Sequence, residues 1–202
     1  MRLLTASADA IADAAAVLRG GGVVAYPTDT LYGLAVDPRN AAAVRRLFDL
    51  KGRNPALAMP LIASSVEQAK AAGELSDAHV RLAHAFWPGP LTIVVPARDA
   101  IDRVLLGGGS TIAVRVPAHP VATALASGLG FCITSTSANR SGQAAASNAQ
   151  EASILLETID LILDGGASPG GPPSTIVELT DAGPRLVRAG AVAWERVLES
   201  LE

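Results

Sequence analysis

The sequence predicts an α/β protein of the α+β type, in which a mixed β-sheet is flanked by helices. Short apolar, β-branched runs alternate irregularly with helical patterns, and some of these runs follow one another directly. A doubly wound parallel sheet would instead place a helix between successive strands. The chain has 202 residues, of which 50% are hydrophobic, and this is enough for one substantial core. We therefore expect a single domain over residues 1–202.

The predicted elements of the N-terminal half have recognisable ends. A helix over residues 7–19 is expected to end at Gly20. The apolar run 22–26 predicts a buried strand that Pro27 stops. Asn40 can cap a second helix, in which apolar residues recur at helical spacing. The further elements of this half are a strand over 59–63 and helices over 66–72 and 77–86.

The C-terminal half is richer in strands. A Gly- and Pro-rich stretch, 165–173, predicts a mobile loop rather than a domain linker, because too little chain follows it to form a second core. Four apolar residues from Trp194 to Leu201 form an i, i+3, i+4, i+7 stripe that predicts a final helix. The other elements are strands over 91–95, 111–116, 131–135, 159–163, 175–179 and 185–188, and a helix over 119–126.

Charge and composition restrict the class of ligand. The formal net charge is −3, whereas proteins that grip RNA over a whole surface are usually basic. A compact anion held by a few lysines and arginines fits this balance better. No apolar stretch approaches the roughly 20 residues that span a bilayer, and residues 1–6 do not begin a signal peptide. We expect a cytoplasmic protein without membrane contact.

Cysteine and histidine usage gives no sign of a metal site or a nucleophile. Cys132 lies in an apolar run and predicts a buried structural thiol. His79 and His84 are five residues apart, which is off the i, i+4 spacing of a helical zinc pair. The pattern of a P-loop does not occur. We therefore expect no tightly bound protein metal.

Two hydroxyl-rich segments follow predicted strands. The segment 26–34 places Thr28, Asp29 and Thr30 after a strand end, where open sheets present ligand sites. An ordinary turn, with Thr and Asp satisfying backbone groups, is the alternative. The segment 135–142 contains several hydroxyls and an amide, which suit a polar ligand, a helix N-cap or an Asx-turn.

Cationic side chains occur near the same predicted strand ends. Lys51 and Arg53 bracket a glycine and can converge on phosphates, or can favour a helix C-terminus through its dipole. Thr111 and Arg115 lie four residues apart on one strand, so they share a face. A substrate carboxylate or a structural Asp or Glu could pair with Arg115. Ser174 and Arg188 flank the last two predicted strands; each could be a plain surface residue.

These segments, in this order, resemble the YrdC/TsaC family, the threonylcarbamoyl-adenylate synthases, and they span nearly the whole chain. The resembling segments are Tyr26–Leu34, Lys51–Arg53, Trp87–Thr92, Ala113–Pro117, Ser137–Gly142 and Ser174–Val177. The resemblance implies a twisted mixed sheet with one open concave face, in the short, single-domain form of the family. One departure is the segment 54–64, which is longer than usual and has Ser64 where many members have histidine.

The resemblance also implies an activity. The family joins L-threonine, bicarbonate or CO2, and ATP with Mg2+, and it releases pyrophosphate and threonylcarbamoyl-AMP. A partner of the TsaD type then transfers the threonylcarbamoyl group to an adenosine beside the tRNA anticodon; contact with tRNA itself is expected to be weak. The alternative is a nucleotide- or RNA-binding module without turnover. A relative in hydrogenase maturation is disfavoured, because zinc-finger and acyl-phosphatase segments are missing.

The resemblance further implies roles for individual residues. Arg115 would pair with the threonine carboxylate, while Lys51 and Arg53 would act in catalysis and bind ATP. The threonine-binding set would be Thr30, Arg115, Ser135 and Ser174, and the ATP-binding set Lys51, Arg53, Thr111, Ser137, Asn139 and Arg188. Fixed cations and Mg2+ suit this reaction, because negative charge develops on the departing pyrophosphate.

Overall fold

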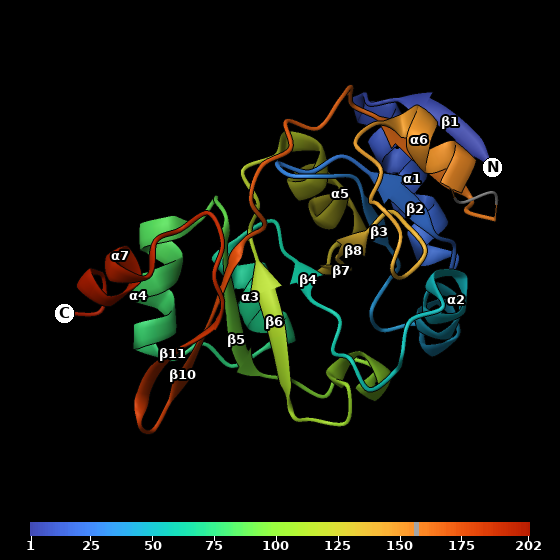
Figure 1. The fold of residues 1–202 in the computed structure, drawn as a ribbon. Helices are drawn as coiled ribbons and strands as arrows, with labels where there is room; N and C mark the ends of the chain where they lie inside the picture. The colour runs from blue at the N-terminus through green and yellow to red at the C-terminus, as the bar shows by residue number, and fades with distance from the viewer. Residues whose placement is uncertain (156–157) are drawn as a thin grey trace.

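A computed structural model describes residues 1–155 and 158–202, which fold into two mixed sheets with helices around them (Figure 1). The first, five-stranded sheet contains, in spatial order, β1 (Arg2–Thr5), β9 (Leu161–Asp164), β2 (Val24–Tyr26), β3 (Gly33–Ala35) and β8 (Thr136–Ser137). The second, six-stranded sheet contains β11 (Gly183–Arg188), β10 (Thr175–Thr180), β5 (Leu91–Pro96), β6 (Thr111–Arg115), β4 (Leu61–Ile62) and β7 (Ile133–Thr134).

Helices cover both sheets. Figure 1 shows α1, α5 and α6 gathered about the first sheet and α3, α4 and α7 about the second. The helices are α1 (Ala8–Arg19), α2 (Ala41–Lys51), α3 (Val66–Ala72), α4 (Asp77–Phe86), α5 (Pro120–Leu129), α6 (Ala149–Leu155) and α7 (Trp194–Glu199), with a 3-10 helix η1 (Arg103–Leu106). Parallel and antiparallel neighbours occur in both sheets. The predicted α/β class and mixed pairing are confirmed.

Caps define the helix ends as the sequence predicts. The Ser7 hydroxyl accepts a hydrogen bond from the Ala10 N–H at the start of α1. The Asn40 side chain accepts from two N–H groups in the first turn of α2. Gly52 ends α2 in the left-handed conformation, with φ of 57°, which a side chain would strain.

The sequence predicts one sheet, and the structure has two. The predicted strand 131–135 contains only β7, which pairs with β4 in the second sheet. A strand that was not predicted, β8, follows it and pairs with β3 in the first sheet. Ser135 lies between them, and its N–H donates to the Pro60 carbonyl at 2.7 Å. Strands of two residues carry no periodicity, so the sequence could not indicate the change of sheet.

Four further elements were not predicted: β1, β3, η1 and α6. In β3 the reason is visible at Gly33, where a Cβ would lie 3.1 Å from the Tyr26 ring. Glycine in a short segment indicates a turn from sequence alone, whereas here it allows two strands to pack closely around a buried tyrosine.

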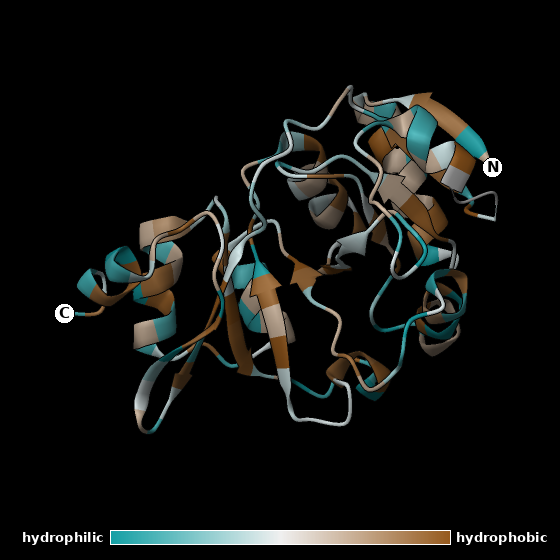
Figure 2. Cartoon of the chain, viewed as in Figure 1, coloured by the Kyte–Doolittle hydropathy of each residue, from teal (hydrophilic) through white to brown (hydrophobic). Residues whose placement is uncertain are grey.

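The apolar interior follows the strands and the inner helix faces, as the hydropathy colouring shows (Figure 2). Tyr26, Tyr32 and Leu34 are fully buried near the junction of the two sheets. Cys132 is buried as predicted, and burial raises the pKa of its thiol to about 12. Among the described residues no helix is long and apolar enough to cross a membrane.

The segment 165–174 carries the chain from β9 in the first sheet to β10 in the second (Figure 1). It contains no helix or strand, in agreement with the predicted loop. The Gly170 N–H donates to the Thr30 carbonyl at 3.0 Å, and the Ser168 N–H donates to the Ser147 carbonyl at 2.8 Å. This crossing therefore lies against the turn between β2 and β3.

Candidate functional site

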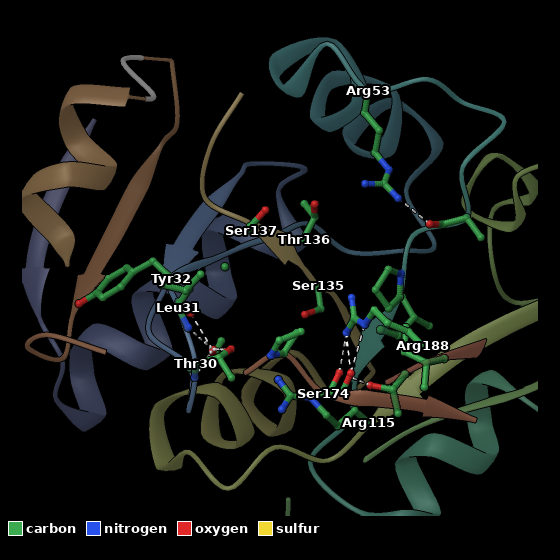
Figure 3. A pocket seen from close by; sticks show the side chains of 18 residues that line it. Thr30, Leu31, Tyr32, Arg53, Arg115, Ser135, Thr136, Ser137, Ser174 and Arg188 are labelled. Carbon is green, nitrogen blue, oxygen red and sulfur yellow. Dashed lines mark hydrogen bonds between the residues drawn. The ribbon is translucent and has the colours of Figure 1, made fainter. Parts of the chain in front are cut away.

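A cavity of about 380 Å3 lies where the two sheets meet. Figure 3 shows Arg53 at one end and Ser174 with Arg115 at the other. Among the described residues, the lining contains three arginines and several hydroxyl groups but no Asp or Glu. The lining residues are Thr28, Thr30, Leu31, Tyr32, Gly33, Arg53, Ala58, Pro60, Leu61, Thr92, Arg115, Ser135, Thr136, Ser137, Pro173, Ser174, Ile176 and Arg188.

Arg115 ends β6 and is held from one side by Asp29, in the turn after β2. Its Nη1 donates to both Asp29 carboxylate oxygens at 3.0 Å, and both side chains are largely buried. Of the two sequence-based alternatives, the protein carboxylate is therefore the observed partner of Arg115. Within the described chain, Nε and Nη2 of Arg115 donate no hydrogen bond, so this edge can still receive a ligand carboxylate.

Arg188 and Ser174 form a second group beside Arg115. The Arg188 Nη2 donates to the Ser174 carbonyl at 2.8 Å and to its Oγ at 3.1 Å. The Ser174 Oγ also lies 2.8 Å from the Thr92 Oγ1. Burial, and then the positive charge of Arg115, lower the pKa of Arg188. Two neighbouring guanidinium groups, that of the buried Arg115 and that of the more exposed Arg188, favour the binding of an anion between them.

Thr30 and Ser135 supply hydroxyls between the two ends of the cavity (Figure 3). The Thr30 Oγ1 lies 3.1 Å from the Thr28 Oγ1, in the turn between β2 and β3. The change of sheet at Ser135 brings the Ser135 side chain into the lining. Predicted residues from four separate segments thus converge on one cavity.

Lys51 lies beneath the cavity rather than in its lining. Its Nζ donates to the Ser137 carbonyl at 2.7 Å and to the Asn139 carbonyl and Oδ1 at 3.0 and 2.8 Å. Burial, and then the charge of Arg53, lower the pKa of Lys51 to about 8. The ammonium has three protons, and all three have acceptors, so Lys51 shapes the segment that follows β8.

Ser137 ends β8, and Asn139 lies in the segment that follows it. The Ser137 hydroxyl donates to the Asn139 Oδ1 at 2.8 Å, and the Asn139 Nδ2 donates to the Gln143 carbonyl at 2.6 Å. Ser137 lines the cavity, while Asn139 is buried behind it. The hydroxyls and amide of this segment are therefore ordered in advance of any ligand.

Arg53 extends into the other end of the cavity. Its Nη2 donates to the Ala58 carbonyl at 2.8 Å, and its Nε is buried without a hydrogen-bond partner among the described residues. Burial lowers the pKa of Arg53. A buried cationic N–H without an acceptor is costly, so this end favours an anionic ligand such as phosphate.

The cavity contains seven of the ten predicted site residues: Thr30, Arg53, Arg115, Ser135, Ser137, Ser174 and Arg188. Lys51 and Asn139 contact it from behind. Thr111 begins β6, at the opposite end from Arg115, and is not in the lining. Ser64 is also outside the lining, and its N–H donates to the Gln68 side chain.

Sequence reasoning did not assign Thr92, Thr136 or Asp29 to the site. Thr92 lies in a predicted strand, where a threonine is ordinary. Thr136 belongs to the hydroxyl-rich segment 135–142, which could have indicated it. Asp29 could have been paired with Arg115, since both segments were suspected; only the contact between the sheets decides that pairing. No group of three or more His, Cys, Asp or Glu able to hold a metal occurs in the described part of the chain.

Fold and cavity together define an α/β protein with a cationic, hydroxyl-rich cavity between two mixed sheets. The chain belongs to the Sua5, YciO and YrdC family, described as "Telomere recombination", which it matches over residues 16–190. This confirms the family indicated by the sequence motifs. The threonylcarbamoyl-AMP synthase of Thiobacillus denitrificans is 44% identical over 165 residues, covering 81% of this chain and 88% of that protein.

Longer relatives match as well. The threonylcarbamoyl-AMP synthase of Pyrococcus abyssi is 38% identical over 186 residues, or 91% of this chain. The chain spans only 55% of that relative. The crystal structure of P. abyssi Sua5 complexed with L-threonine has a TM-score of 0.91 and 35% identity, and the match covers 98% of this chain and 59% of that one.

Proposed function

We propose that this chain is a threonylcarbamoyl-AMP synthase. It would join L-threonine, bicarbonate or CO2, and ATP. The observation that carries the proposal is the cavity lined by three arginines and no carboxylate, which suits a nucleotide phosphate chain and an amino-acid carboxylate together. The names of the relatives that are 36–47% identical support it.

Threonine would occupy the end of the cavity near Arg115. The open Nε and Nη2 edge of Arg115 suits a bidentate bond to its carboxylate. Thr30, Ser135 and Ser174 present hydroxyls close to this end, where they can bind the amine and the hydroxyl of the substrate. The L-threonine complex of P. abyssi Sua5 supports threonine as the ligand.

ATP would occupy the remaining space, with its phosphates between Arg53 and Arg188. Lys51 and Asn139 would hold Ser137 in place behind them. Thr111 is the sequence-predicted ATP residue that this geometry supports least. The described lining offers no carboxylate to a resident metal, so Mg2+ would enter bound to the ATP phosphates and neutralise part of their charge.

The chemistry would require no enzyme nucleophile. The threonine nitrogen adds to CO2, or to bicarbonate with loss of water, and gives a carbamate. A carbamate oxygen then attacks the α-phosphorus, an O–P bond forms, and the bond to the β-phosphate oxygen breaks with release of pyrophosphate. Arg53 and Arg188 would stabilise the charge that develops on the leaving group. The raised pKa of the buried Cys132 thiol is also consistent with a structural role for that residue.

The product is a reactive mixed anhydride, so another protein must consume it. We propose a TsaD-type transfer complex as that partner, acting on tRNA in the cytoplasm. Direct tRNA binding is expected to be weak, because the net charge of the chain is −3.

Pyrophosphate release tests the function. With ATP, Mg2+ and labelled bicarbonate, release should depend on L-threonine, and L-serine should substitute poorly. Label should appear in a nucleotide product only when threonine is present. Equal release without an amino acid would contradict the proposal. ATP binding without any release would instead indicate a nucleotide-binding module without turnover.

A further inference from the structure

The Thr28 hydroxyl already donates its proton in a hydrogen bond within the turn between β2 and β3. The Thr28 Oγ1 donates to the Leu31 carbonyl at 2.6 Å. It also accepts from the N–H groups of Thr30 and Leu31 at 3.2 and 3.3 Å. Thr28 is only 4% exposed, so water has little access to it. A hydroxyl has a single proton to donate, and this one is used.

This donation by Thr28 determines the direction of the hydrogen bond between the Thr28 and Thr30 hydroxyls. The Oγ1 atoms of Thr28 and Thr30 are 3.1 Å apart. Because Thr28 gives its proton to Leu31, a hydrogen bond between the two hydroxyls needs Thr30 as its donor. The Thr30 hydroxyl lines the cavity (Figure 3), and toward a ligand it then offers lone pairs and no proton. To donate to a ligand it would first have to break its bond with Thr28.

We propose that Thr28 is a positioning residue that makes Thr30 a hydrogen-bond acceptor, so that this wall selects a donor group of the amino-acid substrate. The inference rests on the proposed function. Phosphates and carboxylates only accept hydrogen bonds, and the arginines of the cavity serve them. An amino acid with a hydroxyl side chain has two kinds of donor, its amine and its hydroxyl.

Either donor would have a use at this wall. An amine that donates N–H to Thr30 keeps its lone pair free for attack on carbon, whereas an amine that accepts a hydrogen bond does not. A substrate hydroxyl that donates to Thr30 would distinguish threonine from an amino acid of the same shape without oxygen. Both uses require the Thr30 hydroxyl to accept a hydrogen bond, and this acceptor role depends on Thr28.

A double-mutant cycle on threonine binding tests the inference without turnover. Calorimetric titration in the absence of ATP gives the affinity of the wild type, Thr28→Val, Thr30→Val and the double variant. We expect each single variant to weaken L-threonine roughly 5- to 10-fold, the range of one hydrogen bond. The double variant should be no weaker than Thr30→Val, because Thr28 acts through Thr30. Thr28→Ser keeps the hydroxyl and should bind threonine within about 2-fold of the wild type.

Controls separate this role from a structural one. ATP affinity should be unchanged in all variants; a parallel loss, or additive effects in the double variant, would overturn the inference alone. Thr30→Val leaves the turn around Thr28 intact, so this variant tests the inference even if Thr28→Val fails to fold. Normal threonine binding by Thr30→Val would overturn the inference. A wild type that binds no threonine would overturn the proposed function too.

L-2-Aminobutyrate, which is threonine without its hydroxyl, identifies the donor. If the hydroxyl donates, Thr28→Val loses the preference of the wild type for threonine over this analogue. If the amine donates, Thr28→Val weakens both ligands by the same factor. If Thr28→Val changes neither the affinity for L-2-aminobutyrate nor the preference for threonine, neither the amine nor the hydroxyl donates to Thr30. That result would overturn the inference.

Discussion

At the scale of single residues, Arg115 is the cavity residue whose partner is most clearly defined. Asp29 holds one nitrogen of its guanidinium and leaves the other edge free. Arg115 is thus paired with a protein carboxylate, one of the two partners that the sequence left open. Removal of one member of a buried ion pair is destabilising, so a test of its function must retain the charge.

Arg115→Lys retains the charge and can still contact Asp29, but it lacks the planar fork. We predict that this variant folds, binds ATP nearly normally and loses threonine affinity by roughly 10- to 100-fold, or about 1.4–2.8 kcal/mol. A threonine titration and a thermal melt measure the two effects. Lower thermal stability with unchanged threonine affinity would confine Arg115 to its ion pair.

Arg53 gives a complementary prediction at the phosphate end. The only side-chain hydrogen bond of Arg53 among the described residues is to the Ala58 carbonyl, so Arg53→Ala should fold normally. We expect ATP affinity to fall by on the order of 2–3 kcal/mol, measured by titration, while threonine affinity in the absence of ATP is unchanged. Normal ATP binding would show that Arg53 does not contact the phosphates.

Lys51 should affect stability in a pH-dependent way. Its pKa is lowered from 10.5 to about 8 in the folded protein, so the unfolded chain binds this proton more tightly. Its contribution to the free energy of unfolding is therefore lowest below pH 8 and rises as pH increases toward 10.5. The three hydrogen-bond acceptors around the Lys51 Nζ favour its charged form and so limit the lowering of its pKa. We therefore expect the free energy of unfolding to rise by roughly 1–3 kcal/mol over this pH range.

Lys51→Met isolates this contribution. Cys132 and Tyr26 also titrate differently in the folded state, so the measured quantity is the difference in urea stability between wild type and variant from pH 7 to 10. The variant should be less stable throughout, since the Ser137 and Asn139 oxygens lose a donor. A difference that stays constant with pH would contradict the lowered pKa.

At the scale of elements, the close packing of β11 onto the start of β10 positions Ser174 and Arg188. Gly190 follows β11, and a Cβ there would lie 2.5 Å from the Ser174 carbonyl carbon and the Thr175 nitrogen, and also against the Pro173 carbonyl. These are backbone atoms, which cannot move aside as a side chain can. The glycine thus permits an approach that no other residue could make without a shift.

We predict that Gly190→Ala lowers the free energy of unfolding by roughly 1–3 kcal/mol and impairs ligand binding by displacing Ser174. Gly20→Ala is the matched control, because its nearest atoms would be at an ordinary 3.5 Å and its φ is −77°. Urea denaturation and a threonine titration of both variants test this. Equal behaviour of the two would exclude packing at Gly190 as a determinant of the site.

At the scale of the whole molecule, neither sheet is built from one continuous half of the chain. The first sheet pairs β1 with β9, and the second combines β4 with β10 (Figure 1). The chain passes between the sheets three times, over residues 36–60, at Ser135 and over residues 165–174. We therefore propose that residues 1–202 form one domain that unfolds cooperatively.

Trp87 and Trp194 both accompany helices beside the second sheet, so their fluorescence reports on that sheet alone. We predict that urea unfolding followed by tryptophan fluorescence coincides with unfolding followed by circular dichroism, which reports on all helices. Two separated midpoints would show that the sheets unfold independently and would contradict a single domain.

The sequence by itself determined most helices and the local composition of the site. Asn40 and Gly52 define α2 through local hydrogen bonds and backbone conformation, and such effects are encoded within a few residues. The resemblance to the YrdC/TsaC family also pointed to Thr30, Arg115, Ser135 and Ser174, because six motif segments occur in the order typical of that family.

Tertiary structure alone decided how these segments meet. The two-residue strands β7 and β8 belong to different sheets because their partners, β4 and β3, come from distant parts of the chain. Asp29 pairs with Arg115 across 86 positions, and Thr111 lies away from the cavity although it shares a strand with Arg115. Such contacts arise from packing between the sheets, and no local pattern of residues specifies them.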